Sequence, residues 1–304
     1  IQHTFNGNSA NGGTDQGRWM FRWKAPAQSV GRITIYVASI AANDDGSQTG
    51  DLIYTKSASS QPGAAITAVT TVSAASFTQG VALAPEVIVA GFGTGLSQNV
   101  VSATTTPLPT QLDGSEVVVR DSTSTDRNAP LFFVAPSQIN YLIPAGTANG
   151  TATISVKRSG TVVAQGTVQI ESTSPGIFTA NASGTGVPAA LALRVVGTTQ
   201  TFETIYSTQT GQPVATPINL GPVGNDVYLI LYGTGVRNAV AAAVSATIGG
   251  TPTPILGFAP APGFVGLDQI NVGPIPRSLA GRGAVNVELT VGTKTANTVT
   301  INIQ

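Results

Sequence analysis

The sequence contains one stretch twice, first as Pro85-Glu-Val-Ile-Val-Ala-Gly-Phe-Gly-Thr-Gly95 and again as Asn225-Asp-Val-Tyr-Leu-Ile-Leu-Tyr-Gly-Thr-Gly235, with Gly93 and Gly233 140 positions apart. Each copy is a run of β-branched and aromatic residues that ends in glycines, which is typical of a strand followed by a turn. A second match follows in the same order: Phe133-Val-Ala-Pro-Ser-Gln-Ile-Asn140 corresponds to Phe258-Ala-Pro260 and Asp268-Gln-Ile-Asn271. The repeat predicts two copies of one β-rich module.

Further runs of this kind recur about every ten residues between Gly, Pro, Asn and Asp, as in sandwiches and barrels. Several alternate apolar and polar residues, which indicates strands with one buried face. The clearest runs are Arg32–Ala38, Glu86–Ala90, Glu116–Arg120, Thr151–Lys157, Asp226–Tyr232, Ala284–Thr290 and Thr298–Ile303, with hairpin turns at Lys157–Gly160 and Val291–Lys294. We expect an all-β chain of tandem immunoglobulin-like β-sandwiches, at residues 61–173 and 174–304, preceded by an incomplete β-sandwich segment at residues 1–60.

The composition of the chain argues against several classes of partner and location. Only 9% of the 304 residues are charged, and 14 Lys and Arg balance 14 Asp and Glu. Because no basic run could follow a phosphate backbone, a nucleic-acid partner is not expected. No apolar stretch approaches the length of a membrane span; the most apolar one is Val240–Ile248. The chain has no Cys, begins at Ile1 and lacks a leader pattern, so we expect a processed product without disulfides.

The repeated motifs also carry a family resemblance. Gly-Thr-Gly, Ala135–Pro144, Ser174–Thr179 and Asp268–Asn271 resemble an uncharacterised Ig-like C-terminal domain family of secreted and surface proteins of soil bacteria of the acidobacterial type. Residues 18–26, 35–38, 42–47 and 50–55 look like the end of a reelin-type, choice-of-anchor extracellular domain. The resemblance implies a secreted protein located outside the cell or at its surface, and it supplies no catalytic residue.

Catalytic and phosphate-binding patterns are weak. The single histidine, His3, lies beside the start of the chain, where we expect an incidental role. Glycoside hydrolysis would need two carboxylates facing a cleft. Candidates are Asp121 with Asp126, or a pair from Asp44, Asp45 and Asp51, although loop carboxylates are ordinarily solvated. The Gly-Thr-Gly stretches miss the phosphate-loop spacing and are interpreted as turns that need positive φ. We therefore expect no enzyme.

Two features of the front segment could bind a ligand. Asn43, Asp44, Asp45 and Asp51 supply oxygen ligands around a Gly turn, so they form a weak Ca²⁺ candidate, against the simpler interpretation as an Asx-rich turn. No other cofactor is expected. Trp19 and Trp23 share one face of a predicted strand and could stack on sugars or form assembly contacts, although packing in a core is the commoner role. Two further sites, Asn149-Gly-Thr151 and Asn181-Ala-Ser183, fit the glycosylation pattern.

The front segment suggests a function. A few strands with one uncovered face are marginal in water, and unpaired strand edges can be completed by another chain. We predict a non-enzymatic extracellular structural protein that assembles with itself into a surface filament or sheet through inter-subunit β-strand complementation. Two alternatives remain: an adhesin or carbohydrate-binding module that recognises surface glycans through Trp19 and Trp23, or a pair of spacer domains behind another functional domain.

Overall fold

The structure, a computed structural model, describes residues 24, 31–41, 46–47, 49–50, 52–60, 65–209 and 211–304, without the side chains of residues 40 and 41. The chain divides into two compact units, Ile1–Ala64 and Ala65–Gln304. Trp19, Trp23, His3 and the Ca²⁺ candidates Asn43, Asp44, Asp45 and Asp51 all lie outside the described residues.

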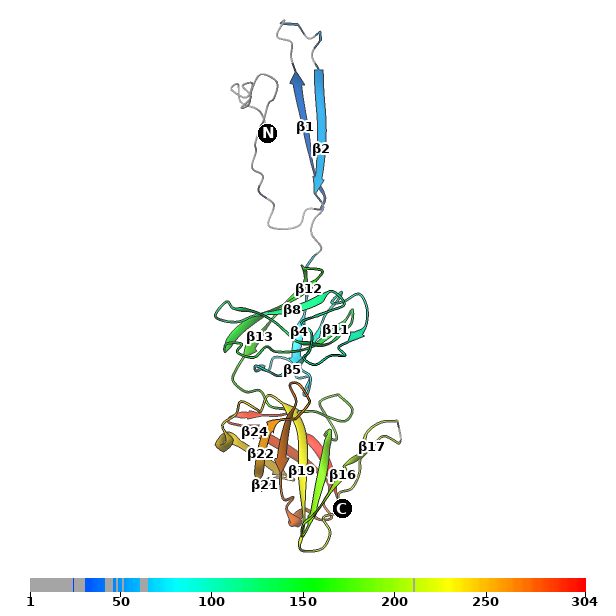
Figure 1. Ribbon diagram of the computed structural model, residues 1–304, viewed down its shortest axis with the longest axis vertical. Coiled ribbons are helices and arrows are strands. Elements are labelled where there is room, and N and C mark those ends of the chain that lie inside the picture. Colours follow the sequence, from blue (N-terminus) through cyan, green and yellow to red (C-terminus); the bar gives the residue numbers. More distant parts are fainter. Residues whose placement is uncertain are drawn as a thin grey trace. The chain divides into compact units, whose positions relative to one another are not determined.

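The described part of the first unit is a long β-hairpin. Strands β1 (Ile33–Ala41) and β2 (Leu52–Ser60) pair antiparallel from Ile33↔Ser60 to Ala41↔Leu52 without a bulge. Figure 1 shows the two strands side by side as a ribbon. Among the described residues, no third strand joins this sheet.

The second unit begins with a two-sheet sandwich, which we call the first sandwich. One sheet has the order β4-β5-β11-β10-β6, with bounds Thr70–Ser73, Ile88–Phe92, Gln138–Leu142, Leu131–Val134 and Val101–Ser102. The other has the order β3-β13-β12-β8-β7, with bounds Thr67–Ala68, Thr161–Ile170, Gly150–Arg158, Ser115–Arg120 and Gln111–Leu112, and β9 (Asp126–Asn128) pairs with β8.

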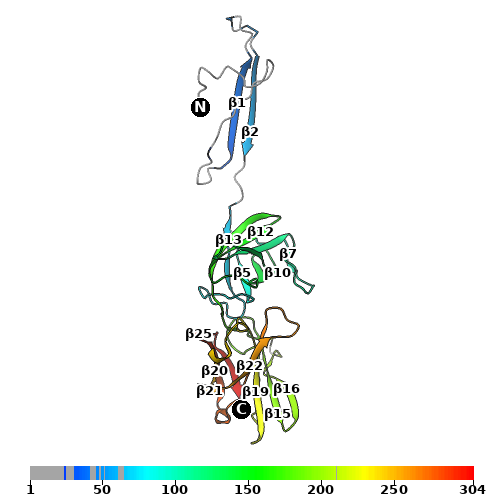
Figure 2. The ribbon, with the colours of Figure 1, turned by 60° about the vertical axis from the view of Figure 1, so that its left-hand side comes forward.

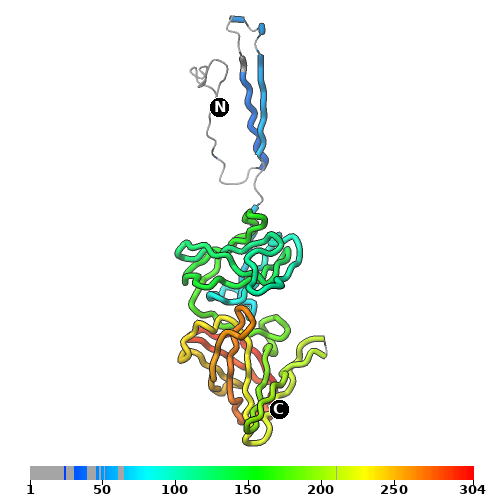
Figure 3. Tube along the Cα trace, viewed as in Figure 1, coloured from blue at the N-terminus to red at the C-terminus, as the bar shows by residue number. Residues whose placement is uncertain are grey.

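The second sandwich, coloured green to red in the tube of Figure 3, is also built from two sheets. Its first sheet runs β16-β15-β19-β23-β22, with bounds Thr199–Thr204, Ala190–Val196, Asn225–Thr234, Asp268–Val272 and Ile255–Pro260, and β14 (Gly176–Ile177) pairs with β19. Its second sheet runs β21-β20-β24-β25, with bounds Thr251–Thr253, Val244–Ile248, Gly283–Val291 and Lys294–Thr295, and β26 (Val299–Ile303) pairs with β24. A small hairpin, β17 (Tyr206–Ser207) with β18 (Val214–Ala215), and two 3₁₀ turns, η1 (Ala241–Ala243) and η2 (Arg277–Leu279), complete it.

Each sandwich encloses its own apolar core, because alternate residues of every long strand point inward. The first core runs from Val69 to Ile170 and includes the fully buried Tyr141; the second runs from Ile177 to Ile303. In the first, the Tyr141 hydroxyl meets Thr71 Oγ1 at 2.9 Å, so the phenol keeps a polar partner inside the core. Burial raises the pKa of this phenol, so it stays neutral.

The predicted fold class is confirmed: the second unit consists of tandem immunoglobulin-like sandwiches, seen from another side in Figure 2. The predicted hairpin turn at Lys157–Gly160 joins β12 to β13, and the turn at Val291–Lys294 joins β24 to β25. The predicted boundaries at residues 60/61 and 173/174 stay predictions.

Candidate functional site

The β1–β2 hairpin exposes large apolar side chains on both faces. By alternation and register, Val37, Leu52 and Tyr54 share one face, which also carries Lys56 opposite Val37. Tyr36 and Ile53 share the other face. Tyr36 is 80% exposed and Ile53 69% exposed, and the other three are each more than half exposed. On the described residues these side chains form an apolar surface on a sheet of two strands.

Cross-strand polar contacts keep the hairpin register. Ser59 Oγ accepts a hydrogen bond from Arg32 Nη2 at 3.2 Å and lies 3.1 Å from Thr34 Oγ1. Such exposed contacts add little stability, and a two-stranded hairpin alone is marginal in water. The hairpin therefore needs further protein to cover it, whether from the first unit or from another chain.

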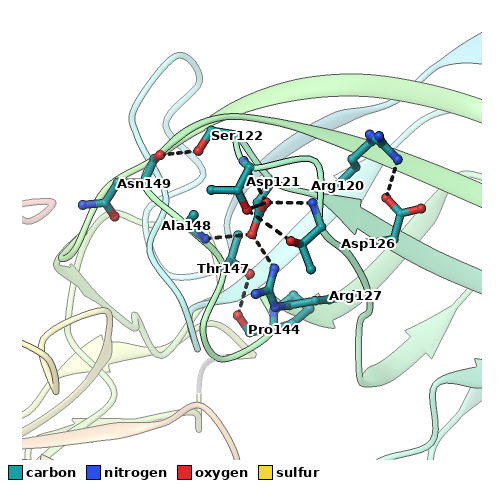
Figure 4. Close-up of polar contacts among 11 residues, drawn as sticks. Arg120, Asp121, Ser122, Asp126, Arg127, Pro144, Thr147, Ala148 and Asn149 are labelled. Carbon is teal, nitrogen blue, oxygen red and sulfur yellow. Dashed lines mark hydrogen bonds and ion pairs between the residues drawn. The ribbon is translucent and has the colours of Figure 1, made fainter.

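The candidate carboxylates Asp121 and Asp126 do not form a catalytic pair. Figure 4 shows Asp121 between the loop that follows β8 and the loop that leads to β12, where Arg127 Nη1 and the Ala148 N–H donate to its carboxylate. Its side chain is fully buried, which corrects the expectation of a solvated loop carboxylate. Asp126 instead pairs with Arg120 at 3.1 Å on the exposed side of the strands.

Hydrogen bonds keep Asp121 ionised. The Thr123 hydroxyl, at 2.7 Å, together with the N–H groups of Ala148 and Thr125 and the Arg127 guanidinium, holds the pKa of this carboxyl well below its usual range, against the opposing effect of burial. A general acid must keep its proton near neutral pH, so Asp121 is suited to joining two loops and not to proton donation. Within the described ranges, no group of three or more His, Cys, Asp or Glu residues could hold a metal ion.

The Gly-Thr-Gly stretches mark strand ends, but the predicted turn is only partly present in the second copy, where Gly233 and Thr234 are the last residues of β19. Only the last glycine of each stretch has positive φ: +68° at Gly95 and +80° at Gly235. The first glycine allows backbones to approach, because a Cβ at Gly233 would lie 2.5 Å from the Gly176 carbonyl oxygen. The threonine differs most between the copies. Thr94 is exposed, whereas Thr234 is fully buried.

Thr234 lies at the junction between the two sandwiches. Its hydroxyl accepts a hydrogen bond from the Ile88 N–H of the first sandwich at 3.1 Å and donates to the Gly266 carbonyl at 2.8 Å. Gly266 packs so closely that a Cβ there would lie 2.4 Å from the Leu142 side chain. The second copy of the motif therefore holds the first sandwich, a role that the sequence did not reveal.

An ion-pair network extends this junction. The buried Asp268 carboxylate accepts hydrogen bonds from Arg237 Nε at 2.7 Å and from the Val236 N–H at 2.8 Å. Arg237 Nη1 reaches Glu86 of the first sandwich at 3.3 Å. In the aligned repeat, Ser97 and Ser137 occupy the places of Arg237 and Asp268. Only the second copy carries this charged pair, and this difference between the copies was the sequence feature that could have indicated the junction.

The two sequons are both exposed. Asn149 lies in the loop before β12, with its side chain pointing away from Asp121 (Figure 4). Asn181 accepts hydrogen bonds from Ser183 through its Oδ1 atom. Among the described residues no helix is long and apolar enough to cross a membrane.

The chain is only weakly similar to known proteins. No protein-family model and no curated protein matches the chain. Similar solved structures include domains 5–6 of the S-layer protein SbsC, at TM-score 0.25 and 15% identity over 80% of this chain and 98% of that one. A three-immunoglobulin-domain segment of titin gives TM-score 0.23 and 11% identity over 82% and 69% of the two chains, and murine CEACAM1b gives 0.19 and 10% over 78% and 100%. These values carry no inference about function, so the fold class rests on the sheet topology.

Proposed function

We propose that this chain is a non-enzymatic, extracellular structural protein whose copies assemble with one another through the β1–β2 hairpin. The observation that carries the proposal is the exposure of apolar side chains on both faces of a paired, nine-residue hairpin. Such a surface on a soluble protein usually marks an interaction site. A strand from another copy would extend the sheet at its edge, and a second sheet packed on its face would bury the apolar side chains.

The second unit supports a structural role because it is a closed, fully bonded body. No buried side-chain nitrogen or oxygen within the described residues lacks a hydrogen-bond partner. The first sandwich and the second sandwich are joined by hydrogen bonds and an ion pair across their junction. A body of this kind can carry load or act as a spacer while the hairpin makes the contact between copies.

The low charge of the chain is compatible with such contacts. With 14 acidic and 14 basic residues, copies experience no net repulsion near neutral pH. An extracellular location follows from the resemblance of the sequence motifs and belongs to the same proposal. Cell fractionation with an antibody to the chain tests that location directly.

The assembly proposal is tested by Ile53→Lys, which places a charge on the apolar face that Ile53 shares with Tyr36. We expect wild-type chains to form multimers in sedimentation velocity, and we expect this variant to shift them strongly towards monomer, because a buried interface does not tolerate an unpaired ammonium group. The matched control is Val223→Lys, since Val223 is 90% exposed in the second sandwich. A monomeric wild type, or equal effects of the two substitutions, would contradict the proposal.

A further inference from the structure

A pair of amide side chains lies at the same place on the outer face of each sandwich. On β23, Gln269 Nε2 donates to Asn271 Oδ1 at 3.0 Å; on β11, Gln138 Nε2 donates to Asn140 Oδ1 at 2.8 Å. The isoleucine within each pair is fully buried in the core, so by alternation the amides point outward. Neither bond uses the glutamine Oε1 or the asparagine Nδ2 atom, which leaves each pair an acceptor and a donor to offer a ligand.

The surroundings of the two pairs differ at one bulged position. Asn140 lies opposite Phe133 on β10, where the register shifts, whereas Asn271 lies opposite Gly257 on β22, at the corresponding shift. A groove of about 380 Å³ lies beside the second pair. Its lining includes Gly257, Ala259, Pro260, Pro262, Gln269 and Asn271, and we call it the β22–β23 groove.

An aromatic ring borders the same amide pair on the opposite side. Tyr232 of β19 lies directly across from Gln269, and Phe92 of β5 lies directly across from Gln138. Because cross-strand partners share a face of the sheet, the half-buried Tyr232 belongs to the outer face that carries the amides. A ligand lying over Gln269 towards β19 would therefore meet a phenol ring.

The chemistry of the groove selects its ligand. None of the residues that line it is charged, which favours a neutral ligand. Amides that offer both a donor and an acceptor suit hydroxyl groups, and an aromatic ring suits the apolar face of a sugar ring.

The same edge is poorly suited to pairing with another strand. Pro260 ends β22, and Pro254 and Pro262 flank the strand, so three backbone positions there lack an N–H donor. We propose that the β22–β23 groove binds neutral sugar residues of a glycan through Gln269, Asn271 and Tyr232, independently of assembly through the hairpin.

The test is binding of neutral hexasaccharides of glucose, mannose and galactose to the full chain, measured by isothermal titration calorimetry. We expect at least one of them to bind. We expect the double variant Gln269→Ala with Asn271→Ala to weaken that binding about tenfold or more, because each hydrogen bond contributes about 1 kcal/mol. The matched control, Gln138→Ala with Asn140→Ala, removes the equivalent pair beside Phe133 and should leave binding unchanged.

A second variant separates the groove from general damage to the fold. A Cβ at Gly257 would meet nothing within 4 Å, and its φ is not in the left-handed region, so Gly257→Phe should fold. The new ring would lie opposite Asn271, as Phe133 lies opposite Asn140, and would occupy the groove. Unchanged sugar binding by Gly257→Phe would overturn the proposal, as would failure of the wild type to bind any of the hexasaccharides. Concentration-dependent protection of the β22 amides without sugar binding would show strand addition instead.

Discussion

Five donors converge on the carboxylate of Asp121: the N–H and hydroxyl of Thr123, the N–H groups of Thr125 and Ala148, and the guanidinium of Arg127. Asp121 lies in one loop, and Ala148, 27 positions later in the sequence, lies in another. The carboxylate therefore joins the two loops at the end of the first sandwich by accepting hydrogen bonds from three backbone N–H groups. A sequence shows only an Asp in a polar loop, which is why its burial could not be predicted.

Asp121→Asn tests this role through pH. The folded-state pKa lies below the unfolded value, so the ionised carboxyl stabilises the fold above about pH 4 and this contribution declines as pH falls towards the folded pKa. We expect Asp121→Asn to lower the urea midpoint at pH 7. At pH 3 we expect a smaller difference in urea midpoint between the variant and wild type. The control Asp126→Asn should change stability by no more than about 0.5 kcal/mol at pH 7, because its ion pair is exposed. If the difference in urea midpoint between wild type and Asp121→Asn does not depend on pH, the ionised carboxylate does not have this role.

Among the elements, the junction between the sandwiches depends on the end of β19, where Thr234 is the last residue of the strand. Thr234→Val keeps the shape of the side chain and removes the hydroxyl that bonds Ile88 and Gly266. We expect a loss of about 2 kcal/mol in the free energy of unfolding, because two buried backbone groups lose their partner. Thr94→Val makes the same change in the exposed copy and should cost less than about 0.5 kcal/mol. Equal effects in denaturant titrations would show that the two turns are equivalent.

Local patterns explain which elements the sequence could predict. Alternation over Thr151–Lys157 and the following Ser-Gly turn specify β12 and β13 without reference to distant residues, and the structure extends β12 to Gly150–Arg158. Strands of two residues, such as β3 and β14, carry no periodicity and were not predicted. The Ile88–Thr234 contact joins residues 146 positions apart, and nothing in either local pattern indicates it.

In the whole molecule, the first unit is the part on which the assembly proposal rests. The sequence predicted a segment with too few strands to close a sandwich, and the described hairpin exposes apolar residues on both faces. The predicted contacts at Trp19 and Trp23, and the weak Ca²⁺ candidate, fall outside the described residues and stay predictions. Each of the two sandwiches, by contrast, encloses its own core. Under increasing denaturant, assembly should therefore be lost before the sandwiches unfold.

Hydrogen–deuterium exchange of the β1 and β2 amides, measured on the full chain over a range of protein concentrations, tests assembly through the hairpin most directly. The account predicts that these amides exchange rapidly where the chain is monomeric and become protected as multimers form, while amides of the buried strands β12 and β19 stay protected throughout. Full protection of the hairpin in the monomer would show that the first unit closes on itself. Exchange that stays rapid in the multimer would show that copies meet elsewhere, and either result would contradict assembly through the hairpin.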